Sequence, residues 1–437
     1  MTAEVQIGDG NVRLSPHPLR AVVLGEVHAR PFTAITVPAR VLHFAFDTSG
    51  TRAAADRAAM TSFCESRGLQ PPVAGEKHHR AKLGTTIVRW EQHSEFTTYT
   101  WELPADPEGA PFYPDASSLA SPMQLLPQPG PLLVAIDLHL MTEDPPRTAP
   151  ERLFDRASLA VAENSDGMAV FATDFQPGPS GFVRVLVLDR GMTPERAGAL
   201  VQRVLEVETY RTLALLGLPE AQRLAPSIAA SERRLAEVTA AMRKSGDLAM
   251  NNRMLEELTE LAADVEAGAA ASLYRFGASR AYDEIMNGRL ATLGERKVGG
   301  LPTWSSFLAR RMKPAMRTCA TTEARQSDLS LKLARAANLL RTRVDVELEH
   351  QNQELLKSMN ARTRLQLRLQ TTVEGLSTAA ITYYVVGLFG YMVKGAAEAG
   401  KLKVDPNLLI ALFVPIAAFS IWWTVRSIRK RHVPDVD

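Results

Sequence analysis

The stretch Leu376–Val393, LSTAAITYYVVGLFGYMV, contains eighteen residues without a charged side chain. A second uncharged stretch, Asn407–Val425, NLLIALFVPIAAFSIWWTV, follows after a short polar loop. An apolar helix of about 20 residues crosses the roughly 30 Å hydrocarbon core of a bilayer. The two stretches therefore predict a transmembrane hairpin, with helices at 376–393 and 407–425 joined by a loop at 394–406. The alternative reading of the same pattern is a helical hairpin buried in the core of a soluble protein.

The basic residues around these stretches predict an orientation. Arginine is absent from the loop 394–406. It occurs on the outer flanks of the two stretches, at Arg362, Arg364, Arg368, Arg426, Arg429 and Arg431. An excess of lysine and arginine marks the cytoplasmic ends of membrane helices. The first ten residues are polar and acidic, without the apolar core of a secretory signal. We therefore expect both termini in the cytoplasm, including a basic tail at 426–437, and the loop 394–406 on the outside.

The overall composition excludes several classes. The chain has 50 Lys and Arg against 48 Asp and Glu, for a net charge of +2, which argues against a nucleic-acid partner. Two cysteines, Cys64 and Cys319, do not form a disulfide framework, and Cys64 is expected as a small buried residue on a helix. Neither GxGxxG nor GxSxG occurs. We expect no enzymatic activity.

Residues 1–190 mix strand and helix signals and predict a cytoplasmic α/β domain. Runs rich in β-branched and aromatic residues predict strands at Val37–Asp47, Leu83–Trp90, Glu95–Leu103, Pro131–Leu140 and Gly181–Asp189. The short segment 92–94 predicts a hairpin between the second and third of these. A helix is expected at Arg52–Arg67, and eight prolines predict a loop at Pro104–Pro131. The pair His78–His79 is expected in a solvated loop.

The chain becomes helical after Gly191. Thr193-Pro194-Glu195 predicts a helix start, with threonine as the N-cap and proline at the first position. We expect a helical domain at 191–320, in which 230–243 and 254–274 pair as a hairpin, followed by a long stalk helix at 321–375. No proline occurs between Thr321 and Asp405, so this helix is expected to continue into the first apolar stretch.

Leucines on the stalk helix recur at a heptad-like spacing, seven or fourteen apart except for the step of eight from Leu340 to Leu348. They are Leu333, Leu340, Leu348, Leu355, Leu369 and Leu376, with Arg362 interrupting the series. This period is typical of a coiled-coil seam. The stripe either packs against the preceding helices or associates with a second copy of the chain, and the sequence leaves both open.

Three runs carry a family resemblance. They are HPLRAVVLGEVHARPF (His17–Phe32), WEQHSEFTTYTW (Trp90–Trp101) and the segment Leu339–Tyr391. On these runs the chain resembles the bacterial family of uncharacterised membrane-anchored proteins called domain of unknown function 3422. That resemblance implies a location in the bacterial inner (plasma) membrane and implies no activity.

The order of the parts is also similar to that of CorA-type divalent-metal channels. That family ends its first span with Gly-Met-Asn, whereas Gly390 is followed here by Tyr391 and Met392. The resemblance implies an oligomeric channel or transporter, with candidate pore residues Thr382, Tyr383, Gly387, Gly390 and Tyr391. The alternative is a membrane-anchored scaffold or sensor whose cytoplasmic domain binds a ligand or a protein partner.

Two polar clusters are the candidate ligand or metal sites. Glu26, His28 and Arg30 share one face if their segment is extended, and a second alternation follows at Glu91, His93 and Glu95. Glutamate and histidine suit divalent cations, so a divalent cation is a possible cofactor. Neither spacing matches a zinc signature. The reading we favour is a salt-bridged network in which Arg20 and Arg30 pair with Glu26 and histidine bridges by hydrogen bonds, ahead of a ligand site and of catalysis.

Overall fold

The computed structural model describes residues 5–7, 12–14, 17–20, 23–24, 32–119, 121–144, 147–244, 246–398 and 404–432. The chain divides into two compact units. The first comprises Met1–Ala241 and Glu257–Ala336, and the second comprises Met242–Glu256 and Ala337–Asp437. Helices α7 (Leu248–Leu293) and α8 (Trp304–Glu398) contribute residues to both units.

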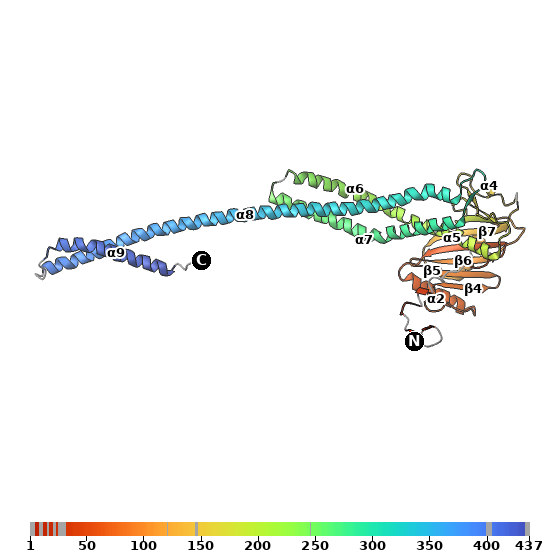
Figure 1. Cartoon of the computed structure of the whole chain (residues 1–437), viewed down its shortest axis with the longest axis horizontal. Helices are drawn as coiled ribbons and strands as arrows, with labels where there is room; N and C mark the ends of the chain where they lie inside the picture. The colour runs from red at the N-terminus through yellow and green to blue at the C-terminus, as the bar shows by residue number, and fades with distance from the viewer. Residues whose placement is uncertain are drawn as a thin grey trace. The chain divides into compact units, whose positions relative to one another are not determined.

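The first unit is built on one large β-sheet. Its strands are β3 (Ala39–Asp47), β4 (His78–Leu83), β5 (Thr86–Gln92), β6 (Phe96–Pro104), β7 (Leu132–Thr142), β8 (Ala160–Glu163), β9 (Ala169–Thr173), β10 (Val183–Asp189) and β11 (Arg296–Lys297). Among the described residues this sheet has nine strands in the order β11-β8-β9-β10-β7-β3-β6-β5-β4. Strands β4, β5, β6 and β7 are labelled in Figure 1. Strands β7 and β10 are parallel, and the other neighbours are antiparallel. The short strands β1 (Val5–Ile7) and β2 (Val12–Leu14) form a separate hairpin. The expected mixed α+β class is confirmed.

The five strands expected from sequence correspond to β3, β5, β6, β7 and β10. The expected hairpin is also present, because β5 and β6 pair antiparallel from Gln92↔Thr97 to Ile87↔Glu102. The expectation of a solvated loop at His78–His79 is wrong. Both histidines lie in β4, where His79 is 8% exposed. Strands β8 and β9 were not expected.

Helix α2 (Arg52–Glu65) covers one face of the sheet. Its Met60, Phe63 and Cys64 share a buried cluster with the aromatic residues of β3, β5 and β6. Burial of Cys64 on a helix is as expected. Asp56 fixes the helix by two hydrogen bonds from the sheet, accepting from Tyr99 Oη at 2.5 Å and from Trp90 Nε1 at 2.9 Å.

Helix α5 (Pro194–Leu215) covers the opposite face. It begins as expected, with Pro194 at the first position and the Thr193 hydroxyl accepting from the backbone N–H of Arg196 at 3.4 Å. Its apolar side joins Ala39, Val41 and the inward residues of β7 in the largest buried cluster. Trp304 and Phe307, from the start of α8, complete that cluster.

The loop after β6 crosses the α2 side of the sheet and contains the short helices α3 (Ala116–Leu119) and η1 (Ser121–Leu125). A buried ion pair lies on this face of the sheet. Arg40 donates to both carboxylate oxygens of Asp137, at 2.8 and 2.7 Å, and to the loop carbonyl of Pro114 at 2.6 Å. Beyond β7, helix α4 (Pro150–Leu153) contributes to a smaller cluster with β8, β9 and β10.

Helix α6 (Gly217–Met242) packs with α7 and the first part of α8. Arg325 of α8 donates to Glu232 of α6 at 2.6 and 3.1 Å. Arg280 of α7 donates to Glu323 of α8 at 3.1 and 3.2 Å. The expected antiparallel pairing of 230–243 with 254–274 agrees with the ion pair between Arg234 and Glu257.

The second unit contains the apolar end of the chain. Helix α8 is unbroken from Trp304 to Glu398, as expected for the stretch into 376–393, although it starts well before the expected stalk boundary at 321. Helix α9 (Pro406–His432) packs against its end, with the rings of Phe389 and Phe413 stacked at 3.8 Å. Helices α8 and α9 each contain a segment that is long and apolar enough to cross a membrane.

The leucine stripe of α8 is buried only in part. Leu333 and Leu340 are fully buried, as the packing alternative predicts. From Leu348 onward the stripe is exposed: 44% at Leu348 and 61% at Leu355 and Leu369. The second half of the stripe therefore has no apolar partner among the described residues.

Candidate functional site

Only the second of the two polar clusters lies within the described residues. Glu26, His28 and Arg30 lie outside the described residues. Glu91 is the second-last residue of β5, while His93 and Glu95 form the turn into β6. The members of the second cluster each have different neighbours, so they do not form one site.

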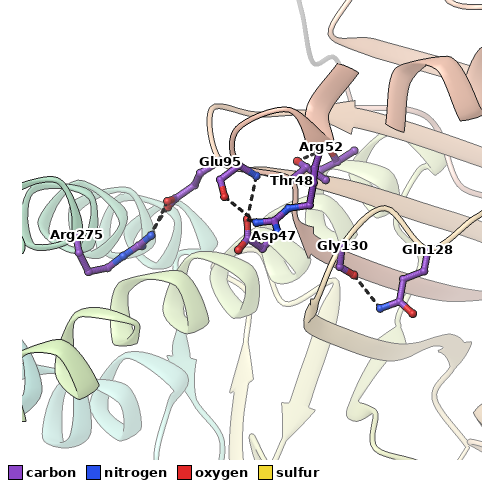
Figure 2. Close-up of polar contacts among 9 residues, drawn as sticks. Asp47, Thr48, Arg52, Glu95, Gln128, Gly130 and Arg275 are labelled. Carbon is purple, nitrogen blue, oxygen red and sulfur yellow. Dashed lines mark hydrogen bonds and ion pairs between the residues drawn. The ribbon is translucent and has the colours of Figure 1, made fainter. Parts of the chain in front are cut away.

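Glu95 is the anchor of this turn. Arg275 of α7 donates to its two carboxylate oxygens at 3.2 and 2.7 Å, and the backbone carbonyl of Glu95 accepts from Thr48 N at 3.0 Å (Figure 2). The hydroxyl groups of Tyr274 and Tyr282, also on α7, point to the same carboxylate. Burial and the Glu95 carboxylate together raise the pKa of both tyrosines. Glu95 is thus in a salt bridge with Arg275 of α7.

No pattern in the sequence indicated Arg275 as the partner of Glu95. Arg275 lies 180 residues from Glu95 in the chain, inside a long helix rich in charged residues. The same holds for Tyr210 on α5 and Tyr282 on α7, which the sequence analysis did not select. Only the fold shows that the β5–β6 turn meets these two helices.

A pocket of about 360 Å³ lies at this turn. Its lining comes from α2, from the chain before β4, from the β5–β6 turn and from α5 and α7: Ala53, Lys77, Gln92, His93, Ser94, Phe96, Tyr210, Tyr282 and Ile285. All of these residues belong to the first unit. The volume is at the lower end of the range for small-molecule sites, which are mostly apolar with a few placed polar groups.

Four rings form the apolar part of the pocket. The His93 imidazole stacks on Phe96 at 4.1 Å, with an angle of 9° between the ring planes. Tyr210 and Tyr282 stack on each other at 5.7 Å, and both meet Phe96 edge-on, at 6.3 and 6.1 Å. Arg275 pairs with Glu95, and the Glu95 carboxylate accepts from the Tyr282 hydroxyl. These two contacts restrain the aromatic wall of the pocket.

The polar rim of the pocket includes Gln92 and Lys77, and hydrogen bonds hold the Gln92 side chain in place. Arg57 of α2 donates to Gln92 Oε1 at 2.7 Å, and Gln92 Nε2 donates to the carbonyl of Ala53 at 2.7 Å. These two bonds fix which way the Gln92 amide faces. Lys77 is exposed and supplies a positive charge at the same rim.

Glu91 lies beside a different group of buried polar residues. Its Oε2 atom accepts from Thr98 Oγ1 at 3.4 Å and lies 3.6 Å from Arg89 Nε. Burial lowers the pKa of His78, which is opposite Glu91 in β4; the charge of Glu91 opposes that shift and Arg89 adds to it. Arg89 Nε, Glu91 Oε1 and His78 Nε2 are buried without a hydrogen-bond partner in the part of the chain that the structure describes.

The possible divalent cation has no evident site. Within the described ranges, no three histidine, cysteine, aspartate or glutamate side chains lie close enough to share a metal ion.

The candidate pore residues lie on the apolar end of α8. The Thr382 hydroxyl donates to the carbonyl of Thr378 one turn earlier, at 2.7 Å. Thr382 and Tyr383 line an apolar groove of about 1090 Å³ between α8 and α9. Gly390 approaches Ile410 of α9, whereas an added Cβ at Gly387 would meet no atom of the described chain within 4 Å. Tyr391 is 79% exposed.

Comparison with known proteins identifies the family of the chain but no individual relative. No curated protein and no solved structure matches the chain, so the resemblance to CorA-type channels is not confirmed. A family model does match, over residues 15–432. The chain therefore belongs to the family described as protein of unknown function, DUF3422.

Proposed function

We propose that the protein is a membrane-anchored sensor or scaffold, in which the sheet unit binds a small ligand in the pocket at the β5–β6 turn. Helices α8 and α9 anchor it in the bilayer. The observation that carries this proposal is the pocket itself, whose walls come from segments far apart in the chain and are held in place by the Glu95–Arg275 ion pair.

Helix α7 gives the pocket a connection to the rest of the molecule. Tyr282, Ile285 and the anchoring Arg275 are all on α7. The first residues of the same helix, up to Glu256, belong to the second unit. A ligand that binds against Tyr282 therefore contacts a helix that both units share, which is a suitable element for a sensor.

Membrane anchoring is supported by the exposed apolar surface of the two helices. Only 6% of the apolar segment of α8 is buried, and the same fraction applies to α9. Large side chains such as Leu376, Tyr383 and Trp423 are 62 to 76% exposed. Extended apolar surface of this kind marks a site of membrane or protein contact. The arginine distribution supports insertion in the bacterial inner membrane with both termini in the cytoplasm.

A binding protein is better supported than an ion channel. The hydroxyls of Thr378, Thr382 and Thr424 donate to carbonyls of their own helices, at 2.7 to 2.8 Å, so these groups are already satisfied. No described residue of these two helices supplies an observation that favours conduction.

Catalysis has less support than binding. Two buried histidines of the sheet, His43 and His139, do not line the pocket, and burial lowers the pKa of each to about 3. We retain the view that the protein is not an enzyme.

Self-association through α8 is part of the proposal. The exposed stripe keeps a seven-residue period, which fits the same stripe on a second copy of the chain. Leu369→Glu should reduce the mass of the detergent-solubilised particle, because the change puts a charge into the seam. Leu367→Glu is the matched control, since Leu367 is 55% exposed, close to the 61% of Leu369, but lies off the stripe. Equal masses for both variants would reject self-association by this face.

The ligand proposal is tested by filling the pocket. A mixture of bacterial small molecules should raise the melting temperature of the purified protein, and Ser94→Trp should abolish the increase because Ser94 lines the pocket. Thr85→Trp, in the exposed turn between β4 and β5, is the control and should leave the increase unchanged. If the mixture has no effect on the wild-type protein, or the same effect on Ser94→Trp, the pocket is not a ligand site.

A further inference from the structure

The size of the pocket limits the ligand. About 360 Å³ accommodates a molecule of one or two rings, well below the upper end of known small-molecule sites at roughly 1,000 Å³. Two of its lining residues, Lys77 and Ser94, are exposed, so one end of a bound molecule remains near solvent.

The walls favour a flat molecule. Phe96, Tyr210 and Tyr282 contribute rings, and Ile285 and Ala53 add aliphatic surface. Aromatic rings prefer offset-stacked or edge-to-face neighbours. The ion pair between Glu95 and Arg275 restrains Tyr282 through its hydroxyl, so a planar ligand meets a wall that is already ordered.

The charge of the lining favours an anion. Among its nine residues there is no aspartate or glutamate, and Lys77 is its one permanently charged side chain. Glu95 is the nearest acid in the turn, and both of its oxygens accept from Arg275. Arg57 adds a second positive charge directly behind Gln92. The imidazole of His93 is a further hydrogen-bonding group on the same side.

We infer that the pocket binds a small planar carboxylate, with its ring against Tyr210 and Tyr282 and its carboxylate at the Lys77 and His93 rim. This inference rests on the proposed ligand-binding function and adds the chemical class of the ligand. Charge-assisted hydrogen bonds from lysine to a carboxylate are stronger than those to a neutral amide.

Three probes of nearly the same shape test the charge: benzoate, benzamide and benzylammonium. Their binding to the full-length protein in detergent is measured by titration calorimetry. Benzoate should bind at least tenfold more tightly than benzamide, and benzylammonium should bind most weakly. Lys77→Gln should remove most of the preference for benzoate, whereas Lys82→Gln, at an exposed position of β4, should preserve it.

The outcomes distinguish a failure of the carboxylate inference from a failure of the proposed ligand-binding function. If benzylammonium or benzamide binds as well as benzoate, or if Lys77→Gln keeps the preference, the carboxylate inference is wrong while a ligand site remains. If none of the probes binds and the small-molecule mixture described above has no effect either, the proposed function itself fails. Tyr282→Leu should weaken benzoate and benzamide equally, which distinguishes the ring contact from the charge contact.

Discussion

Two histidines in the sheet are held neutral by burial. His43 is enclosed between Thr100 and Thr209, whose hydroxyls lie 2.8 and 3.1 Å from its ring nitrogens. Burial, with the charge of Arg89, lowers the pKa of His43 to about 3. Burial, with the charge of Arg40, lowers the pKa of His139 to about 3. An unfolded histidine has a pKa of about 6.5.

The first prediction concerns the effect of acid on stability. Between pH 6.5 and about 3 the unfolded chain binds protons at positions 43 and 139 that the folded chain does not, so stability falls as the pH falls through this window. Lowering the pH from 7.5 to 5 should cost about 2 kcal/mol for each histidine. Chemical denaturation at several pH values measures this dependence. His43→Asn should flatten the curve, and an unchanged slope in that variant would show that His43 titrates in the folded protein.

The second prediction concerns the buried ion pair between Arg40 and Asp137. Arg40 and Asp137 are each 2% exposed, so Arg40→Ala leaves a buried carboxylate without its partner. The change should reduce the free energy of unfolding by about 3–5 kcal/mol. Arg52→Ala, which breaks the half-exposed pair with Asp47, should cost less than about 1 kcal/mol. Equal costs, from thermal or chemical unfolding, would contradict the burial argument.

At the scale of elements, whether a strand could be predicted from the sequence depended on its amino-acid composition. Strand β6 is rich in threonine and aromatic residues and was predicted, because such residues fit a pleated, buried surface. Strand β4, HHRAKL, alternates buried His79 and Ala81 with exposed Arg80 and Lys82, and its basic residues concealed that alternation. Strands β8 and β9 consist largely of alanine and valine, and alanine favours helix in isolation.

Only the part of the candidate site in the β5–β6 turn could be predicted from the sequence. The sequence pointed to His93 and Glu95 because polar residues alternate there, and His93 lines the pocket while Glu95 anchors it. The residues that make it a pocket, Tyr210 and Tyr282, look like ordinary members of amphipathic helices. Their role depends on where α5 and α7 pack on the sheet, which no short-range pattern specifies.

The third prediction concerns the packing of α5. At Gly198 an added Cβ would lie 1.7 Å from the backbone oxygen of Thr33, so Gly198→Ala requires the segment before β3 to move. The variant should be destabilised by roughly 1–3 kcal/mol. Gly277→Ala on α7 is the control, because nothing lies within 4 Å of its Cβ position. There alanine should stabilise by up to about 1 kcal/mol, since it is the better helix former. Similar melting temperatures for both variants would argue against the close approach.

At the scale of the whole molecule, the testable property is the proposed membrane topology, with both termini on one side. The ends of α8 and α9 are separated by a short connection, and arginine is confined to the far ends of the two apolar stretches. This is the fourth prediction. A cysteine replacing Ala397 should react with a membrane-impermeant thiol reagent added to intact cells, because the proposed orientation puts this position outside. A cysteine at Asp437 should react only after the cells are opened.

The same labelling experiment can reject the hairpin. Reaction of both positions in intact cells, or of neither, places them on one side of the membrane. The reverse pattern would keep the hairpin and invert its orientation. Cys64 and Cys319 are buried and serve as internal controls for the integrity of the sheet unit.

The position of the core residues in the chain has a consequence for biosynthesis. The last residues that the sheet needs for its largest cluster, Trp304 to Met312, precede the first apolar stretch at Leu376 by more than sixty positions. Domains commonly fold as units during translation, in the order in which they are made. The sheet unit can therefore close on the ribosome before the apolar end of α8 is synthesised. A ribosome stalled after residue 375 should already carry a protease-resistant nascent domain, and the bilayer would then receive a chain whose soluble part has finished folding.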